Sequence, residues 1–342
     1  MSRRRRRRWP LRFAVPALLL LLLVLAAGAA VRSLFTPFQG FSGEAFVEIA
    51  KGISVRAIAD ELVQNGAARS RWQFLAVRLL RPSARLQAGE YRFAHPDSAW
   101  NIFDRIVRGD VFYYELTVPE GSNMFDIAAV VDRLGFLNSE DFLRAARAPA
   151  LVRDIAPAAP TLEGYLFPST YRVTRSATVR QLCRMMTEEF RRQWHALDPP
   201  AEIDVHRAVT MASMVEKETA VEAERPAVAS VYYNRLDRGM ALDCDPTTIY
   251  AALLDGRYRG TIYRSDLASR NPYNTYAHTG LPPGPIANPG AASLRAALHP
   301  ASTYYLYFVA RPDGSGLHQF SADLAAHNRA VEQYRQGERH RR

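Results

Sequence analysis

The chain has 342 residues, enough for about two domains with a sizeable core. Hydrophobic residues make up 48% and charged residues 23%, which excludes a wholly disordered chain, and 19 glycines with 21 prolines exclude collagen-like and low-complexity classes. Two cysteines, Cys183 and Cys244, are too few for a disulfide framework or a four-thiolate metal site, and we expect both to be unpaired thiols.

The net charge of +10 is concentrated at the N-terminus. Arg3 to Arg8 and Arg12 supply seven positive charges before the first acidic residue, leaving +3 for the rest of the chain. The remainder is therefore close to balanced and has no basic stripe interleaved with aromatic residues. We predict no nucleic-acid partner.

A candidate membrane anchor follows this basic segment, residues 1–12. Residues 13–31 are a run of 19 residues without a charge, which at ~1.5 Å per residue can cross a hydrocarbon core of ~30 Å. Because the arginines precede the run, the positive-inside rule keeps the N-terminus in the cytoplasm and exports the rest. We predict a single transmembrane helix; the alternative is a cleaved signal peptide, for which residues 26–30 offer small side chains.

After a linker, residues 32–43, one pattern occurs twice at a spacing of 69 residues. The spacing separates Gly52 from Gly121, Ile58 from Ile127 and Gly66 from Gly135, which indicates an internal repeat. Each copy is predicted to contain a strand, a glycine turn and a helix capped by Ser54 or Ser122, closed by the later glycine. Second helices are expected over residues 72–80 and 141–146, and a returning strand over 86–93.

The first copy, residues 44–113, is therefore predicted to be a strand–helix–helix–strand unit. This arrangement resembles the LysM module, which recognises glycans containing N-acetylglucosamine. The alternative is a generic small α+β unit in which the glycines only make turns.

The remaining domain, residues 114–335, is predicted to be α+β, followed by a basic tail, residues 336–342. Helices are expected over residues 179–197, 206–220 and 225–236, the last with Pro226 in its first turn. Six prolines between residues 271 and 300 predict a long ordered loop. A strand is expected over 304–309, and a last helix capped by Ser321 and ending near Tyr334.

Common catalytic signatures are missing from the sequence. It has no HExxH, paired CxxC, Walker loop, G-x-S-x-G or GxGxxG motif, and its eight histidines lack ligand spacing. We therefore expect no metal and no cofactor, which leaves chemistry carried out by carboxyl groups.

The best candidate lies within the predicted helix over residues 206–220. At ~100° per residue, Met211, Met214 and Val215 form an apolar stripe, and Glu218 projects towards its centre. Glu216 points roughly 160° away, so Glu218 is expected to be half-buried and Glu216 more solvated. Burial favours the protonated form of Glu218, as a general acid for glycoside cleavage requires. The alternative is an ordinary solvated helix with a Glu-Lys-Glu charge pattern.

Seven motifs occur in an order that resembles the YceG-like endolytic murein transglycosylase family. They are EGYLFPSTY at 163–171, ASMVEKETA at 212–220, VYYNRL at 231–236, DPT at 245–247, YNTY at 273–276, GLPPGPIANPG at 280–290 and YLYFV at 305–309. The resemblance covers the whole exported part. It implies that Glu218 is the catalytic residue of a lytic transglycosylase, a carbon–oxygen lyase acting on polysaccharide.

The resemblance also implies a setting: a single-pass protein of the cell inner membrane with a periplasmic catalytic domain. Peptidoglycan glycan strands would be its substrate and peptidoglycan synthases its partners. Amide, hydroxyl, aromatic and carboxyl side chains suit a polyol cleft, although capping and packing roles are open for each. The substrate-binding candidates are Glu163, Asn234, Asp245, Thr247, Tyr250, Asn274 and Tyr276.

Two features qualify this interpretation. Cys244 stands where the resemblance implies a small hydroxyl residue, and Glu222, one helical turn after Glu218, would raise its pKa if the helix continued that far. Two other functions stay open: a hydrolytic muramidase using Glu218 with Asp245 or Glu222, and a non-catalytic glycan-binding scaffold.

Overall fold

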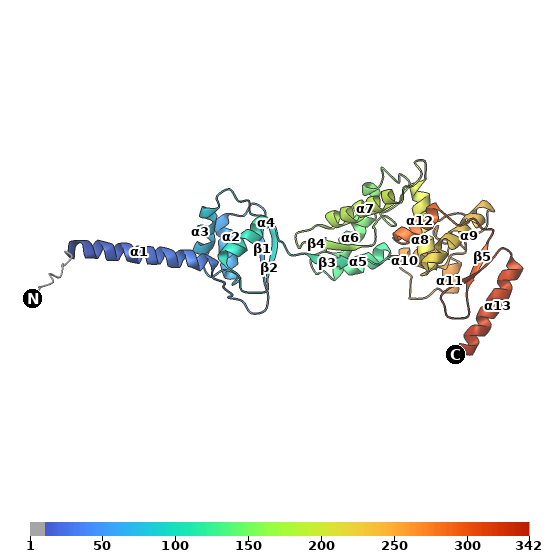
Figure 1. Cartoon of the computed structure of the whole chain (residues 1–342). Coiled ribbons are helices and arrows are strands. Elements are labelled where there is room, and N and C mark those ends of the chain that lie inside the picture. The colour runs from blue at the N-terminus through green and yellow to red at the C-terminus, as the bar shows by residue number, and fades with distance from the viewer. Residues whose placement is uncertain (1–10, 342) are drawn as a thin grey trace, which may run out of the picture. The chain divides into compact units, whose positions relative to one another are not determined.

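The computed structural model describes residues 11–341, and the chain divides into two compact units (Figure 1). Unit 1 comprises the chain up to Tyr114 together with Thr174–Ser176; unit 2 comprises Glu115–Val173 and the chain from Ala177 onwards. Most of the predicted basic segment lies outside the described residues. Helices dominate, and the strands of the described part form three two-stranded sheets, so the chain is of mixed α and β structure.

The described part of the chain begins with an apolar helix that is longer than predicted. Helix α1 covers Leu11–Phe35, and its segment Val15–Phe35 has the length and composition needed to cross a membrane. The helix therefore continues into the predicted linker. Leu34 in its last turn is buried in the hydrophobic core of unit 1.

Unit 1 has the predicted strand–helix–helix–strand order. Strands β1 and β2 pair antiparallel, from Ala45 opposite Phe93 to Ile49 opposite Gly89, and apolar residues alternate inward along β1. A further helix, which the sequence analysis did not predict, completes the core. The elements are β1 (Ala45–Ile49), α2 (Val55–Gln64), α3 (Arg71–Leu80), β2 (Gly89–Phe93) and α4 (Ala99–Arg108).

The internal repeat is confirmed by the backbone. The glycines of both copies share a left-handed conformation, with φ of 81° and 73° at Gly52 and Gly121 and of 71° and 72° at Gly66 and Gly135. Ser54 caps α2 as predicted, but Asn123 rather than Ser122 caps the corresponding helix, because its side chain accepts two N–H groups of the first turn. The second copy consists of β3 (Tyr114–Thr117), α5 (Met124–Asp132), α6 (Ser139–Ala146) and β4 (Thr170–Val173), with β3 paired to β4.

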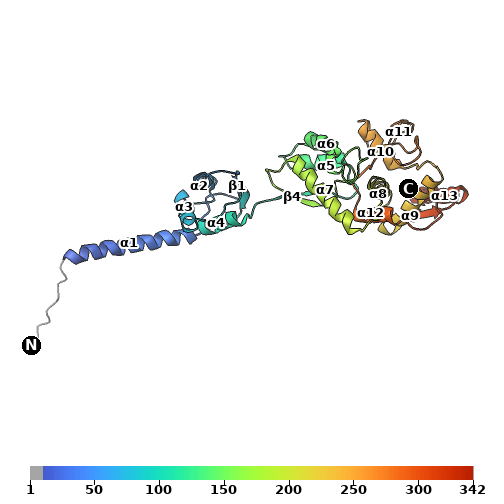
Figure 2. The same ribbon diagram turned by 90° about the horizontal axis from the view of Figure 1, so that it is seen from above.

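The core of unit 2 is built around one buried helix. Helix α8 (Val205–Glu218) is buried continuously from Ala208 to Val215, so it is covered on all sides rather than amphipathic as predicted. It packs against α9 (Arg225–Asp237), α10 (Asp245–Leu254) and α12 (Ala291–Leu298), and α7 (Val179–Ala196) lies alongside α12 and α6 (Figure 2). The prediction of a long ordered loop over residues 271–300 is corrected by α12, which occupies Ala291–Leu298.

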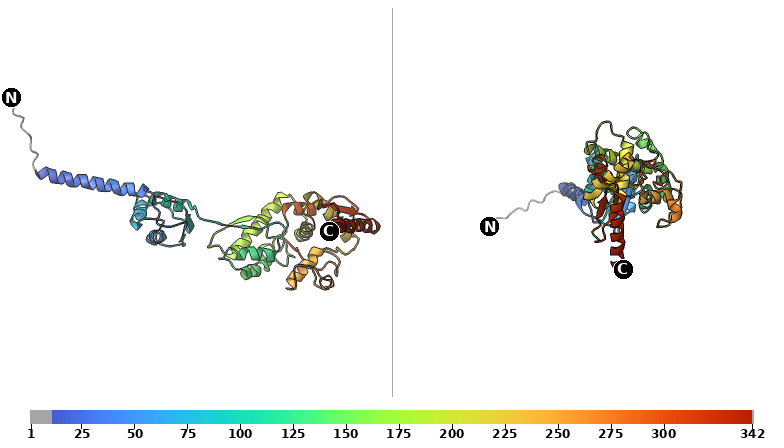
Figure 3. Two further views of the ribbon diagram at one scale, coloured as in Figure 1. Left: turned by 90° about the horizontal axis from the view of Figure 1, so that it is seen from below. Right: turned by 90° about the vertical axis from the view of Figure 1, so that its right-hand side faces the viewer.

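The C-terminal part of unit 2 also departs from the prediction. Ser321 ends strand β6 (His318–Ser321), which pairs with β5 (Tyr307–Ala310), and Asp323 instead accepts the N–H of Ala326 at the start of the last helix. This helix, α13, packs against β5 and β6 and runs to Arg341, well past Tyr334 (Figure 3). The short elements are η1 (Pro149–Leu151), η2 (Glu222–Glu224) and α11 (Arg264–Leu267).

Candidate active site

Glu218 is the last residue of α8, at the point where the buried helix reaches a cleft. The helix ends there because Thr219 adopts an extended conformation. The hydroxyl of Tyr232, from α9, donates a 2.7 Å hydrogen bond to Glu218 Oε1, and the thiol of Cys244 interacts with the same carboxyl group. Two neighbouring elements therefore fix one carboxyl group at the end of a rigid helix.

The surroundings of Glu218 favour its protonated form. Burial raises the pKa of this carboxyl group above its ordinary value, and the charge of Asp245 raises it further, against the lowering effect of the Tyr232 and Cys244 hydrogen bonds. The half-buried position agrees with the prediction from helical phase. The condition set for Glu222 is not met, because α8 stops at Glu218 and Glu222 lies in η2 rather than one turn along the same helix.

The cleft beside Glu218 has a volume of about 450 Å³. Two of the substrate-binding candidates, Asp245 and Tyr276, line it, and the Tyr276 hydroxyl donates a 2.6 Å hydrogen bond to Asp245 Oδ1. Tyr307 from β5 and His327 from α13 form other parts of the wall. Polar groups and aromatic faces therefore converge on the carboxyl group of Glu218.

Asn234 supports the segment that leads into β5, a strand on the wall of the cleft. Its side-chain amide donates to the carbonyl oxygens of Thr303 and Tyr305, both at 2.9 Å, just before β5 begins. Its neighbour Arg235 was not among the candidates, yet it lines the cleft and donates to the Leu306 carbonyl at 2.7 Å. The signal for Arg235 was its place in the VYYNRL motif, which also contains Tyr232.

Glu163 and Tyr250 lie in the core and not on the cleft wall. The side chain of Glu163 is fully buried, and its oxygens accept the Met124 N–H at 2.9 Å, the Tyr250 hydroxyl at 3.0 Å and the Asn288 amide at 2.8 Å. Asn288 Oδ1 in turn accepts the N–H groups of Gly164 and Leu166. This network joins the EGYLFPSTY and GLPPGPIANPG motifs to helices α5 and α10.

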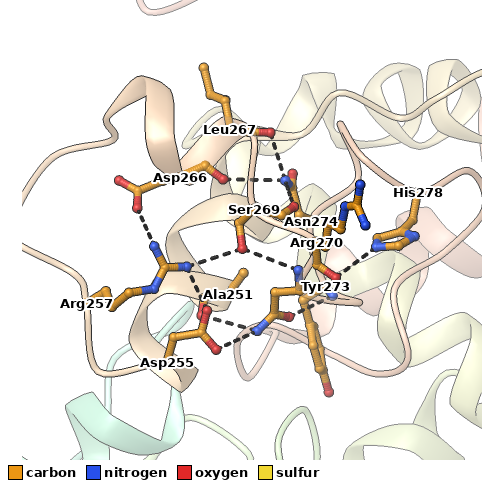
Figure 4. Close-up of polar contacts among 11 residues, drawn as sticks. Ala251, Asp255, Arg257, Asp266, Leu267, Ser269, Arg270, Tyr273, Asn274 and His278 are labelled. Carbon is orange, nitrogen blue, oxygen red and sulfur yellow. Dashed lines mark hydrogen bonds and ion pairs between the residues drawn. The ribbon is translucent and has the colours of Figure 1, made fainter.

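Thr247 and Asn274 are also buried, and they anchor the loop that carries Tyr276. Asn274 donates to the carbonyl oxygens of Leu267 and Ser269, inside a polar network that includes Arg257 bridging Asp255 and Asp266 (Figure 4). Its Oδ1 accepts the N–H of Tyr276 at 3.1 Å. The Thr247 hydroxyl bonds that of Thr275 at 2.8 Å. Both residues therefore position a cleft residue without lining the cleft.

Glu216 is not the more solvated carboxylate that helical phase predicted. Its side chain is 5% exposed and pairs at 3.1 Å with Arg225, whose side chain is 9% exposed. The other oxygen accepts the N–H of Gly290, the N-cap of α12, at 3.0 Å. Lys217, between the two glutamates, donates to the Gly121 carbonyl in the second repeat copy at 3.1 Å. Glu216 is therefore held in contacts that stabilise the fold, whereas Glu218 faces the cleft.

The burial of Glu163 predicts a pH-dependent stability. Burial raises its pKa from 4.5 to about 8, so the folded state holds this proton more tightly than the unfolded state does. We expect its contribution to the free energy of unfolding to be complete below about pH 4.5 and lost as the pH rises to about 8, on the order of several kcal/mol. When the free energy of unfolding is measured with urea across this pH range, Glu163→Gln should lack the pH dependence that comes from this carboxyl group.

The control for this prediction is Glu202→Gln, at an exposed position, which should keep the slope. The Glu163→Gln variant starts from a lower stability, because one amide N–H then faces the Asn288 amide donor. A slope identical to that of the unsubstituted protein would show that Glu163 does not titrate in this range.

No group of three or more His, Cys, Asp and Glu side chains among residues 11–341 is placed to hold a metal ion. Cys183 and Cys244 are buried and free. The carboxyl groups that line the cleft are those of Glu218, Asp243 and Asp245.

Comparison with known proteins identifies the family. The sequence model of the YceG-like family matches residues 47–333. The chain belongs to the YceG-like family. An endolytic murein transglycosylase of Bacillus subtilis is 34% identical over 307 residues, covering 84% of each chain. One from Streptococcus pneumoniae is 27% identical over 298 residues, which are 77% of this chain and 54% of that longer protein.

A solved structure agrees with this membership. The crystal structure of a yceG-like protein from Listeria monocytogenes matches with a TM-score of 0.53 and 30% sequence identity, over 84% of this chain and 99% of the other. The resemblance found in the ordered motifs is thereby confirmed at the level of the family.

Proposed function

We propose that this YceG-like chain is an endolytic murein transglycosylase, a carbon–oxygen lyase that cleaves peptidoglycan glycan strands internally. The observation that carries the proposal is Glu218: a single half-buried carboxyl group, with its pKa raised, at the end of a rigid helix and on the wall of a polar cleft. Relatives covering most of the chain carry this name, which supports the proposal.

In the proposed mechanism Glu218 acts twice. As an acid it protonates the oxygen that bridges N-acetylmuramic acid and N-acetylglucosamine, and the glycosidic bond breaks. As a carboxylate it then removes the proton of the muramyl 6-hydroxyl, whose oxygen bonds to C1 and closes a 1,6-anhydro ring. The proton returns to Glu218, and no water is consumed. The charge of Asp245 in the same cleft would stabilise the positive charge that develops on the sugar ring.

The products test this proposal directly. Digestion of defined glycan strands should yield fragments ending in 1,6-anhydromuramic acid, each lighter by one water than a hydrolysis product and without a reducing end, as mass spectrometry would detect. Because Asp245 lies in the cleft with Glu218, a hydrolytic muramidase is the second candidate, and reducing-end products would establish it. Strands that bind but stay uncut would indicate the glycan-binding scaffold instead.

Tyr232 offers a test of the protonation step. Its hydrogen bond favours the charged form of Glu218, so Tyr232→Phe should raise the pKa of that carboxyl group further. Cleavage that needs the protonated acid is lost as the pH rises through this pKa, and the falling limb of the pH–rate profile should move to higher pH in the variant. The profile is measured at saturating substrate. If the falling limb of Tyr232→Phe coincides with that of the unsubstituted protein, a group other than Glu218 is responsible for it.

For the substrate-binding candidates we propose two roles. Asp245 and Tyr276, which line the cleft, would contact the glycan. The other five are proposed to hold the cleft in shape, since their side chains bond to buried groups or loop carbonyls; they are Glu163, Asn234, Thr247, Tyr250 and Asn274.

We further propose that α1 is a single-pass anchor in the cell inner membrane, with the N-terminus in the cytoplasm and the rest of unit 1, together with unit 2, in the periplasm. Unit 1 would act as a LysM-like glycan-binding module. A groove of about 430 Å³ between the turn after β1 and the segment before β2 supports this, and Gly52, Ile53 and Arg85 line it. Peptidoglycan synthases would be partners, because strands still attached to them would pass the anchored enzyme.

A further inference from the structure

Helix α3 of unit 1 leaves large apolar side chains uncovered. Trp72 is 67% exposed, Leu79 80% and Leu80 62%. Trp72 and Leu79 are seven residues apart, so they share one face of the helix, while Phe74 and Val77 on the opposite face are fully buried in the core. The outer side of the neighbouring helix α4 instead exposes Asn101 and Arg108. Of the two neighbouring helices, α3 is therefore the one with the exposed apolar face.

The internal repeat shows that the fold does not require this face. Helix α6 is the counterpart of α3 in the second copy; Asn138 caps it as Ser70 caps α3, and Phe142 is buried as Phe74 is. Matching Ser70 to Asn138 and Phe74 to Phe142 aligns the two helices at a spacing of 68 residues, one fewer than between the repeat glycines. In this alignment the second copy has polar or small residues where the first has exposed apolar ones. Glu140, Arg147 and Ala148 correspond to Trp72, Leu79 and Leu80.

Helix α3 also lies against the end of the proposed anchor. The side-chain amide of Gln73 donates to the carbonyl oxygen of Ser33, in the last turns of α1, at 2.9 Å. Phe35, the last residue of α1, stacks on Trp100 of α4 with ring centroids 5.1 Å apart. Both Figure 1 and Figure 2 show α3 on the side of unit 1 where α1 enters and β1 on the other side. The first turn of α3 therefore lies beside the last turns of α1.

The charge around α3 fits a lipid surface. Residues 69–85 contain five arginines and no acidic residue, whereas residues 137–153 of the second copy contain two acidic residues. Arg81 pairs with Asp104 of α4 at 3.0 Å, and Arg71 lies 3.8 Å from Asp60 of α2, so a net positive charge remains around α3. Helices that lie in the interface of a bilayer combine a Trp- and Leu-bearing face with basic side chains that reach the phosphates. Tryptophan is enriched at this depth.

We propose that α3 lies on the outer surface of the bilayer that α1 crosses, with Trp72, Leu79 and Leu80 in the headgroup region. Helix α1 runs without a break from its apolar segment to Leu34 and Phe35, which pack in the core of unit 1 and on Trp100, so no spacer separates the membrane from the rest of unit 1. The contact would fix the orientation of unit 1 on the membrane. This inference rests on the proposed anchoring by α1.

Spin labels on the full-length protein in vesicles containing anionic phospholipid test the proposal. Leu79→Cys reports on α3, Glu48→Cys on the exposed face of β1 is the matched control in the same unit, and Leu22→Cys in α1 tests the anchor. Cys183 and Cys244 are buried, and the unsubstituted chain measures background labelling. The ratio of oxygen to nickel-chelate accessibility should be several-fold higher at position 79 than at position 48, and highest at position 22.

The possible outcomes separate the two proposals. A label at position 79 that is as aqueous as the one at position 48, with position 22 in hydrocarbon, overturns the surface contact and leaves the anchor intact. A label at position 79 that neither reagent reaches indicates a protein contact and also overturns it. An aqueous label at position 22 overturns the anchor and the surface contact together.

Discussion

Replacing Glu218 by glutamine is expected to lower the rate of glycan cleavage by about 10² or more while the fold is kept. The amide has the shape of the carboxyl group and still accepts the Tyr232 hydroxyl hydrogen bond. It cannot donate an acidic proton to the glycosidic oxygen, nor remove one from the 6-hydroxyl. Initial rates of 1,6-anhydro product release measure the effect, and thermal unfolding measures the fold.

The control for this variant is Glu222→Gln, at an exposed position in η2. It removes a carboxylate close in sequence, and its rate should stay within about twofold of the unsubstituted protein, because α8 ends before this residue. Near-normal cleavage by Glu218→Gln would remove the mechanism proposed here. A large loss with Glu222→Gln would instead favour the hydrolytic mechanism with Glu222 as the second carboxylate.

The local features of the fold were predictable from the sequence, because they depend on neighbouring residues. The spacing of 69 residues placed the four turn glycines correctly, since a left-handed turn selects glycine wherever it occurs. Helical phase placed Glu218 towards apolar side chains for a similar reason. Helix α12 was missed because the prolines around it dominated the interpretation, although AASLRAAL itself favours a helix.

The non-local contacts of the site were not predictable in this way. The phase of α8 cannot show that Arg225, beyond the end of the helix, and Gly290, 74 residues away, both contact Glu216. Likewise Glu163 has the chemistry of a substrate ligand, and only the packing of α5, α10 and Asn288 around it buries it. Residue type therefore identified the candidates, while the packing around each decided which of them face the cleft.

The contrast between the two glutamates of α8 leads to the second large effect. Glu216→Gln removes the charge that pairs with Arg225, a buried guanidinium whose Nε has no hydrogen-bond partner among the described residues. Its other carboxylate contact, Glu120, is at 3.9 Å and half-exposed. Breaking a buried ion pair on one side costs about 3 kcal/mol or more, and we expect the melting temperature to fall by roughly 10 °C. The change in cleavage rate at a temperature where the variant is folded should be much smaller than for Glu218→Gln.

The double variant Glu216→Leu with Arg225→Met tests whether the loss of stability comes from leaving Arg225 without its charged partner, rather than from any substitution at position 216. Because it removes both charges together and fills similar volume with apolar groups, it should be more stable than Glu216→Gln in thermal unfolding. A double variant less stable than Glu216→Gln would mean that the hydrogen bond from Gly290, rather than the ion pair, holds the start of α12. An unchanged melting temperature for Glu216→Gln would mean that Arg225 finds sufficient compensation from Glu120, and the structural role assigned to Glu216 would then be wrong.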